Sequence, residues 1–144
     1  MAPKTFRVTG VILSRQNFGE DDKIVVAYTK EFGKMHLKAS GIRRLNSKRA
    51  PHLELFNEVD MFLHHGKTFF LITEAKLLSS YSNLKSNLEL CAYAFYLAEV
   101  MDKLSPDNQP HPLIYDGLVQ VLKRLDTAGI QKETALHDVK EFIL

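Results

Sequence analysis

Near Ser79 the spacing of the apolar residues changes, and this change separates two kinds of secondary structure in one chain. Before it, short segments rich in β-branched and aromatic residues alternate with turns, which is typical of antiparallel strands. After it, apolar residues recur every three or four positions, which is the period of an amphipathic helix. A run of strands followed by a run of helices predicts an α+β fold with two parts, residues 1–80 and 81–144.

Five strands are expected in the first part, at residues 6–13, 24–29, 35–39, 55–64 and 68–75. Gly10 lies inside the first of them and predicts a bulge or a bend, as at the corner of a small barrel. Residues 15–22 are polar and are expected to form a turn, and Gly33 supplies the positive φ that a hairpin at 30–34 needs. Five short strands of this kind predict a small antiparallel barrel or sandwich.

Three helices are expected in the second part. The stripe of the first consists of Leu84, Leu88, Cys91, Phe95, Ala98 and Met101. Ser86 and Glu89 have the spacing of a capping box at its start, and Asn83 is an alternative cap one turn earlier. Pro112 is expected to begin a second helix, whose stripe is Ile114, Leu118, Val121 and Leu125. A third helix near 131–143 has an unfinished pattern at Leu144, which predicts a truncated chain.

Basic residues are concentrated in one stretch. Seven of the nineteen basic residues, but one of the seventeen acidic residues, lie between positions 30 and 49, so the net charge of +2 conceals an uneven distribution. The alternation along 35–39 is expected to place three polar side chains on one face of a strand, namely Lys34, His36 and Lys38. The loop that follows adds Arg43, Arg44, Lys48 and Arg49. Such cations would neutralise phosphates and release their counterions, which suits a polyanion.

Three interpretations of this basic stretch stay open. Tyr28, Phe32 and His36 lie close by and could stack on nucleobases if they point outward, which favours a nucleic-acid-binding surface. A charge run is also a common solvated face that keeps a strand edge from aggregating. The third interpretation is an adaptor whose basic loop binds an acidic protein, with DNA binding incidental.

No group of residues predicts an active site, and we expect no enzymatic activity, metal or cofactor. The motifs GxGxxG, GxxxxGK[ST], GxSxG and HExxH are absent. Residues 20–22 could hold Mg²⁺ or serve a nuclease, but in a tight turn such residues usually make turn hydrogen bonds. His64 and His65 are adjacent in a strand and point to opposite faces, so they do not easily chelate a metal. Cys91 is expected to be a core thiol, and a single cysteine forms no intrachain disulfide.

Composition excludes several classes of protein. With 45% hydrophobic and 25% charged residues, the chain resembles a globular protein rather than a disordered or fibrous one. No apolar run is long enough to span a bilayer, and the N-terminus lacks the apolar region of a secretory signal. A cytoplasmic location is therefore expected.

A set of short motifs occurs in a characteristic order along the chain. They are VIL (11–13), FGEDD (18–22), YT (28–29), GK (33–34), ASGIRRLNS (39–47), LELF (53–56) and LITEA (71–75). Together with residues 88–104, this set resembles the N-terminal domain and the start of the helical domain of the RecO family of bacterial recombination mediators. Ser40 and Leu55 depart from the Lys and Pro that the family commonly has.

The resemblance implies an OB-fold barrel of five strands followed by a helical domain. It implies a non-enzymatic protein of the bacterial cytoplasm, associated with the nucleoid, that binds single- and double-stranded DNA. It also implies annealing of strands coated by single-strand binding protein, and loading of RecA together with RecR. Many members carry a cysteine-rich zinc module later in the chain, which is absent from this sequence.

The resemblance also implies which residues contact DNA and partners. By position, the DNA-contacting cations would be Lys34, Lys38, Arg43, Arg44, Lys48 and Arg49. The acidic tail of single-strand binding protein would dock on the helical domain. Lys123 and Arg124 are candidate contacts for that tail, although an exposed helix face explains them as well.

Overall fold

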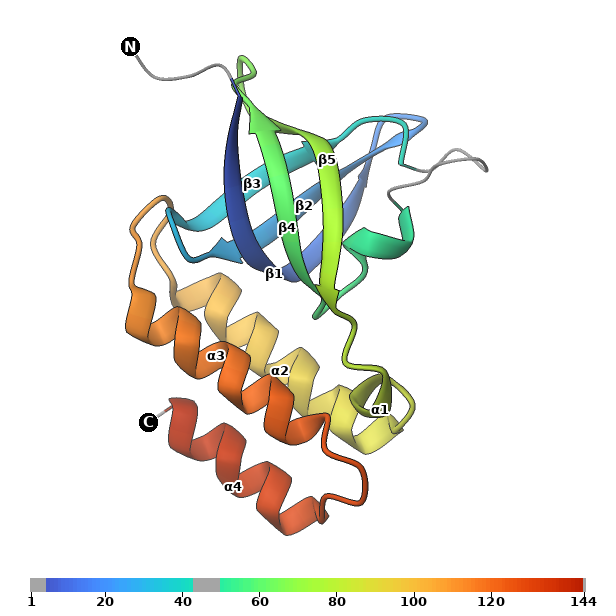
Figure 1. The fold of residues 1–144 in the computed structure, drawn as a ribbon, viewed down its shortest axis with the longest axis vertical. Coiled ribbons are helices and arrows are strands. Elements are labelled where there is room, and N and C mark those ends of the chain that lie inside the picture. Colours follow the sequence, from blue (N-terminus) through green and yellow to red (C-terminus); the bar gives the residue numbers. More distant parts are fainter. Residues whose placement is uncertain (1–4, 43–49, 144) are drawn as a thin grey trace.

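The computed structural model describes residues 5–42 and 50–143, and within them strands precede helices (Figure 1). The strands are β1 (Thr5–Phe18), β2 (Asp22–Thr29), β3 (Gly33–Ala39), β4 (Glu58–His64) and β5 (Phe70–Ser79). A short 3-10 helix, η1 (Ala50–Leu53), precedes β4. The helices are α1 (Ser82–Lys85), α2 (Leu88–Leu104), α3 (Pro112–Leu125) and α4 (Lys132–Ile143). Within the described ranges, no helix is both long and apolar enough to cross a membrane.

The five strands close into a barrel in the order β1-β2-β3-β5-β4. Neighbouring strands are antiparallel, except that β3 and β5 run parallel. The barrel closes because β1 is long enough to pair with β4 through its first half and with β2 through its second half. Closure removes the free edges that an open sheet would have. The predicted OB-type barrel followed by helices is thus confirmed.

Gly10 lies where β1 changes partners, since it pairs with both Thr29 and Val59. A Cβ atom at this position would lie 3.0 Å from the carbonyl oxygen of Tyr28, so the close approach of the strands favours glycine. The bulge predicted at Gly10 lies further along β1, between Ile12 and Ser14. The strand was therefore correctly identified and the position of the bulge was wrong.

Several strand boundaries differ from the sequence prediction; the fifth strand, for example, spans Phe70–Ser79 rather than 68–75. Residues 15–18 continue β1 and pair with β2, so the turn expected at 15–22 is confined to residues 19–21. The polar composition suggested a turn, but backbone pairing to β2 does not depend on side-chain polarity. The strand expected from residue 55 begins only at Glu58, because Phe56 has a positive φ of 69° and interrupts the extended backbone.

Apolar residues fill the inside of the barrel. They come from all five strands, from η1 and from the start of the loop after β3. The buried set is Val8, Ile12, Val25, Ala27, Met35, Leu37, Ala39, Ile42, Leu53, Val59, Met61, Leu63 and Ile72.

A second core lies between the outside of the barrel and the helices, which pack beneath the barrel in Figure 1. The barrel contributes Val11, Leu13, Val26, Tyr28 and Phe56. The helical part contributes, among others, Leu84, Leu90, Leu97, Met101, Leu118, Leu122 and Leu125. Residues of β1 and β2 are buried on both faces and contribute to both cores, so the second core joins the barrel to the helices.

The start and the buried face of α2 differ from the prediction. Asn87 is the N-cap, with its side-chain oxygen accepting the Leu90 N–H at 3.1 Å, so the capping box at Ser86 was wrong. The buried residues are Leu90, Ala94, Leu97, Ala98 and Met101. Leu88 and Phe95 of the predicted stripe are exposed. Between Leu90 and Met101 every residue of α2 except Glu99 is apolar or aromatic, so local spacing did not determine which side faces the barrel.

The predicted stripe of α3 is largely confirmed. Pro112 occupies the first turn, and Leu118, Val121 and Leu125 are buried, whereas Ile114 is exposed. The periodicity of α3 was informative because its other side is polar.

A buried carboxylate forms an ion pair between the neighbouring strands β1 and β4. Arg7 on β1 donates from Nε to both carboxylate oxygens of Asp60 on β4 at 2.8 Å. The Asp60 side chain is buried while that of Arg7 is mostly exposed. The hydrogen bond from Arg7 lowers the pKa of the Asp60 carboxyl below its ordinary value of 3.8, outweighing burial, which would raise it.

Acid is expected to destabilise the barrel through Asp60. The folded state favours the ionised Asp60 carboxyl and therefore binds fewer protons than the unfolded chain. The stabilising contribution of Asp60 is fully present above the ordinary pKa and is lost as the pH falls through the lower pKa of the folded state. Urea unfolding from about pH 4 to about pH 2 should therefore show a shallower pH dependence in Asp60→Asn than in the parent chain. Glu133→Gln, an exposed carboxyl on α4, is the control with the same charge change. Equal slopes in Asp60→Asn and the parent would contradict this role.

Candidate nucleic-acid interface

The three polar side chains of β3 share the outer face of the barrel, as the sequence predicted. Buried and half-buried residues alternate along β3. Across the ladder, the β3 residues lie opposite residues of β2 in the pairs Lys34–Tyr28, His36–Val26 and Lys38–Ile24. Directly opposite residues of a ladder share a face, so this face is part cationic and part apolar.

Lys34 is bound to the helical part of the protein. Its ammonium donates to the carbonyl oxygen of Asp102 at 2.6 Å and lies 3.5 Å from the carboxylate of Asp107 and 3.8 Å from that of Asp102. The side chain is 12% exposed. Lys34 therefore joins the barrel to the end of α2. Lys34 was predicted to be a DNA-contacting cation, but in this position a phosphate would have to displace these partners.

The loop between α2 and α3 covers the same end of β3. The backbone N–H of Asn108 donates to the Lys34 carbonyl at 2.9 Å, and His36 Nε2 lies 3.1 Å from the Asp107 carboxylate. Partial burial alone would raise the pKa of Asp107, but the hydrogen bond from His36 and the charge of Lys34 bring it below its ordinary value. His36 remains part-exposed, but its ring is already engaged by Asp107.

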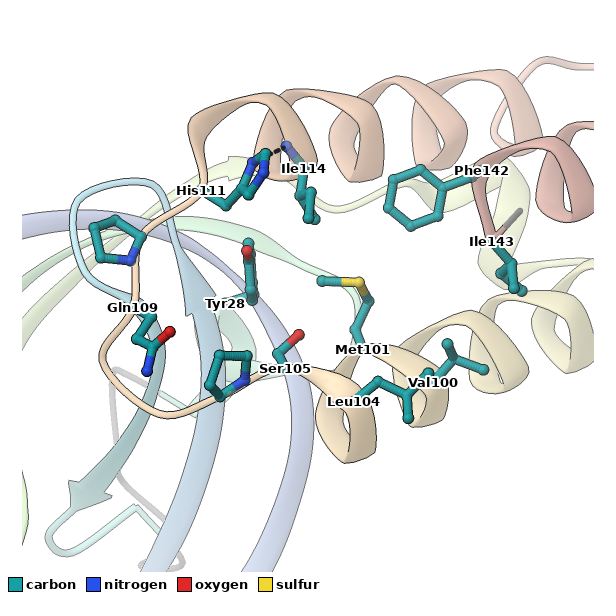
Figure 2. Close-up of a pocket in the computed structure, with 12 residues that line it drawn as sticks. Tyr28, Val100, Met101, Leu104, Ser105, Gln109, His111, Ile114, Phe142 and Ile143 are labelled. Carbon is teal, nitrogen blue, oxygen red and sulfur yellow. Dashed lines mark hydrogen bonds between the residues drawn. The ribbon is translucent and has the colours of Figure 1, made fainter.

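Tyr28 lies on the outer face of the barrel, where the helices cover it. It is almost fully buried, and burial raises the pKa of its phenol. Figure 2 shows it at an apolar pocket of about 310 Å³ between the ends of α2, α3 and α4, together with Met101, Ile114 and Phe142. The suggested stacking on nucleobases depended on an accessible ring, and Tyr28 does not meet this condition.

Phe32, the other aromatic residue of the prediction, is 41% exposed in the hairpin between β2 and β3. Its ring meets Phe6 edge-on, with centroids 5.4 Å apart. Phe6 in turn packs against the barrel interior.

The opposite end of the β3 face is not covered by the helical loop. Lys38 is about a third exposed, with its ammonium 3.7 Å from Asp22 and 5.5 Å from the centroid of the Phe18 ring. Phe18 is 43% exposed and contacts Phe69 edge-on, with centroids 5.9 Å apart. Phe18 was not among the residues predicted to contact DNA, because residues 15–22 were interpreted as a turn. The feature that could have indicated its role is an aromatic residue at the end of a strand, close to a cationic residue.

The remaining predicted cations, Arg43, Arg44, Lys48 and Arg49, lie outside the described residues. The chain enters their segment from the Lys38 end of β3. Asp22 accepts a hydrogen bond from the Gly41 N–H at 2.7 Å, so it holds the start of this connection. This is the structural role expected for an acidic turn residue rather than a metal site. Across residues 5–42 and 50–143, no three His, Cys, Asp or Glu residues gather where they could hold a metal ion.

Lys123 and Arg124 lie in the last turns of α3 and are exposed. Lys123 lines a pocket of about 410 Å³ between α3 and the barrel, together with Lys30 and Glu58. Arg124 lies 3.8 Å from the carboxylate of Asp138 on α4. The two side chains are accessible, and Arg124 already has an acidic partner.

Cys91 and the two adjacent histidines have ordinary structural surroundings. Cys91 is half-buried on α2, with its sulfur 3.5 Å from the carbonyl oxygens of Leu84 and Lys85. His64 lies 3.4 Å from the Thr5 hydroxyl, whereas His65 packs on aromatic rings.

Comparison with known proteins identifies the family. Residues 1–81 match the family model described as "Recombination protein O N terminal", and residues 85–143 match "Recombination protein O C terminal". The chain belongs to the RecO family. The resemblance drawn from the short motifs is thereby confirmed, and the two RecO models meet where the barrel gives way to α1.

Individual relatives agree with this assignment. A protein of Dehalococcoides mccartyi named "DNA repair protein RecO" is 32% identical over 124 residues, which is 86% of this chain and 49% of the relative. A protein of the same name from Listeria welshimeri is 29% identical over 117 residues, or 81% of this chain and 46% of the relative. The chain spans about half the length of the curated relatives it matches.

Proposed function

We propose that this chain is the DNA-binding part of a recombination mediator that acts without enzymatic activity in DNA repair. It binds single-stranded DNA and anneals complementary strands in the bacterial cytoplasm. The observation that supports this most strongly is the Lys38 end of the barrel's outer face, which the loop between α2 and α3 does not cover. From there the chain leads into four further cations within seven residues, Arg43, Arg44, Lys48 and Arg49. The relatives named as DNA repair proteins support the same role.

The proposed phosphate contacts are Lys38 and the four cations of the following segment. Lysine and arginine side chains neutralise phosphates whatever the sequence, and the release of condensed counterions then drives binding. Lys34 is left out of this set because its ammonium already has three oxygen partners in the helical part. A barrel that binds strands across an outer face is the common use of the OB fold.

The proposed partners are RecR, single-strand binding protein and, indirectly, RecA. Lys123 and Arg124 are the proposed contacts for the acidic tail of single-strand binding protein, since both are exposed cations on the same helix. A pull-down with that tail should weaken when both residues are replaced by alanine. Unchanged capture would place the tail elsewhere.

Replacing Arg43 and Arg44 with alanine is expected to weaken DNA binding without unfolding the chain. Two lost phosphate contacts should make the slope of log K against log salt shallower by about 1.4 on a single strand. That corresponds to roughly 10- to 100-fold weaker binding at about 50 mM salt. Fluorescence anisotropy with labelled oligonucleotides of unrelated sequence, over a salt series, measures both quantities.

The matched control replaces Lys103 and Lys132, two exposed cations of the helices, which changes the charge by the same amount. This control should bind DNA nearly as the parent chain does. If both double variants lose affinity equally, binding follows net charge rather than this surface. If the parent binds no DNA at low salt but captures an acidic protein, the adaptor alternative is correct.

A further inference from the structure

Phe18 is an exposed aromatic ring at the end of the longest strand, and packing does not explain its exposure. A phenylalanine side chain gains most of its stabilisation by leaving water, yet Phe18 keeps 43% of its surface exposed. Its described ring contacts are the edge of Phe69 and the ammonium of Lys38. A ring held in place but left in water is suited to bind another flat group.

The strand register presents this ring and the lysine on one face. Phe18 lies opposite Asp22, and Ile24 lies opposite both Gln16 and Lys38. Directly opposite residues share a face, so Phe18 and Lys38 point to the same outer side of the barrel. Phe69 reaches the same place from the hairpin between β4 and β5. Three separate segments therefore build this surface.

We propose that Phe18, Phe69 and Lys38 form a base-stacking platform for single-stranded nucleic acid. An unpaired base stacks on the exposed part of the Phe18 ring, and Lys38 binds the adjoining phosphate. This inference rests on the proposed DNA-binding function and adds the residues that would contact the bases of a single strand. Bases in a duplex are already stacked on each other and do not offer their faces, whereas unpaired bases stack on aromatic rings whatever their sequence.

The charges around the platform fit a strand whose backbone runs along the Lys38 side. Asp22 is 3.7 Å from Lys38, but the Gly41 N–H also binds its carboxylate, so Asp22 does not depend on the lysine alone. Lys67 is exposed two residues before Phe69. Glu20, exposed in the turn after Phe18, disfavours phosphate on that side.

Phe32 provides the internal comparison. Its exposed fraction of 41% nearly equals that of Phe18. Its ring, however, packs edge-on against Phe6, and no lysine or arginine of the described residues lies over it. Exposure alone therefore does not define the platform; the nearby cation and the open sheet face do.

The test compares two oligonucleotides of equal length and charge, oligo(dT) and the same backbone with abasic sites. The parent chain should bind oligo(dT) roughly 5- to 100-fold more tightly, because stacking contributes only when a base is present. Phe18→Leu should close most of this gap, leave binding to the abasic strand within about twofold, and leave the salt slope unchanged. Phe18→Tyr, which keeps a ring, should retain the gap. Phe32→Leu is the matched control and should behave as the parent.

Thermal unfolding of every variant tests whether the fold is retained. If the parent binds both strands equally, the platform is wrong while phosphate binding, and with it the proposed function, stands. If it binds neither strand at low salt, both fail. Equal losses in Phe18→Leu and Phe32→Leu would overturn the platform, because any exposed ring would then serve.

Discussion

Alanine in place of Gly33 should lower the free energy of unfolding by about 3 kcal/mol. Gly33 has a positive φ of 73°, which costs an L-residue about 1 kcal/mol. In addition, a Cβ atom there would lie 2.2 Å from the carbonyl oxygen of Gln109 in the loop between α2 and α3. Overpacking of this kind costs about 1–3 kcal/mol. Because the clashing atom belongs to the backbone, no side-chain rotation relieves it, and the loop itself must move.

Gly19→Ala separates the two causes. Gly19 also has a positive φ, of 66°, but an added Cβ would meet no heavy atom of the described residues within 4 Å, its chain neighbours aside. Only the conformational cost of about 1 kcal/mol should appear. Urea unfolding of both variants measures the difference. Gly33→Ala should also make the loop at 105–111 more susceptible to proteolysis, since the contact with β3 is what holds it. Equal losses in the two variants would mean that the loop does not press on Gly33.

Leu97→Ala is the second substitution with a large expected effect. Leu97 is fully buried on α2, in the core that the barrel and the helices share. Removing the side chain should cost about 3–4 kcal/mol, the sum of lost burial and the cavity left behind. Because one core joins the two parts, hydrogen exchange should rise in β1 and β2 of the barrel as well as in α2. A rise confined to the helices would show that the two parts unfold independently.

Leu88→Ala is the matched control on the same helix. Leu88 is 87% exposed, so the same substitution should change the free energy of unfolding by less than about 0.5 kcal/mol. Local spacing had placed Leu88, rather than Leu97, on the buried face. The pair therefore tests the orientation of α2 directly.

The structure divides the cationic face of β3 into two ends with different roles. At one end Lys34 and His36 bind the loop between α2 and α3, so these side chains hold the barrel against the helices. At the other end Lys38 lies beside an exposed phenylalanine. The proposed nucleic-acid surface is smaller than the charge pattern suggested, but it gains the aromatic ring of Phe18.

Much of the fold was predictable from local patterns. Alternation along β3 identified both the strand and its polar face, and Gly33 marked the hairpin by its positive φ. In α3, where a polar side contrasts with an apolar one, the buried residues followed the helical period. Each of these features depends on residues that are close together in the chain. The spacing of residue types along the sequence therefore reveals them.

The features that were missed depend on partners distant in the chain. Residues 15–18 form a strand because β2 offers them backbone hydrogen bonds, which their polar side chains do not reveal. The ring of Tyr28 is inaccessible because helices more than sixty residues later cover the outer face of the barrel there. In α2, almost uniformly apolar, only the position of the barrel selects the buried side.

The sequence alone determined that this chain is an α+β protein of the RecO family, with strands before helices and a basic stretch after β3. Periodicity, glycine positions and the order of motifs are local properties of the chain, so they can be recognised from the sequence alone. Only the tertiary structure showed that the helical part binds Lys34 and that Lys38 stays partly exposed. Lys34 and Asp102 are 68 positions apart, and packing of the helices against the barrel brings them together. Whether a cationic side chain can bind a ligand depends on such long-range contacts. Its burial and its ion pairs are determined by the segments that pack against it in the folded chain.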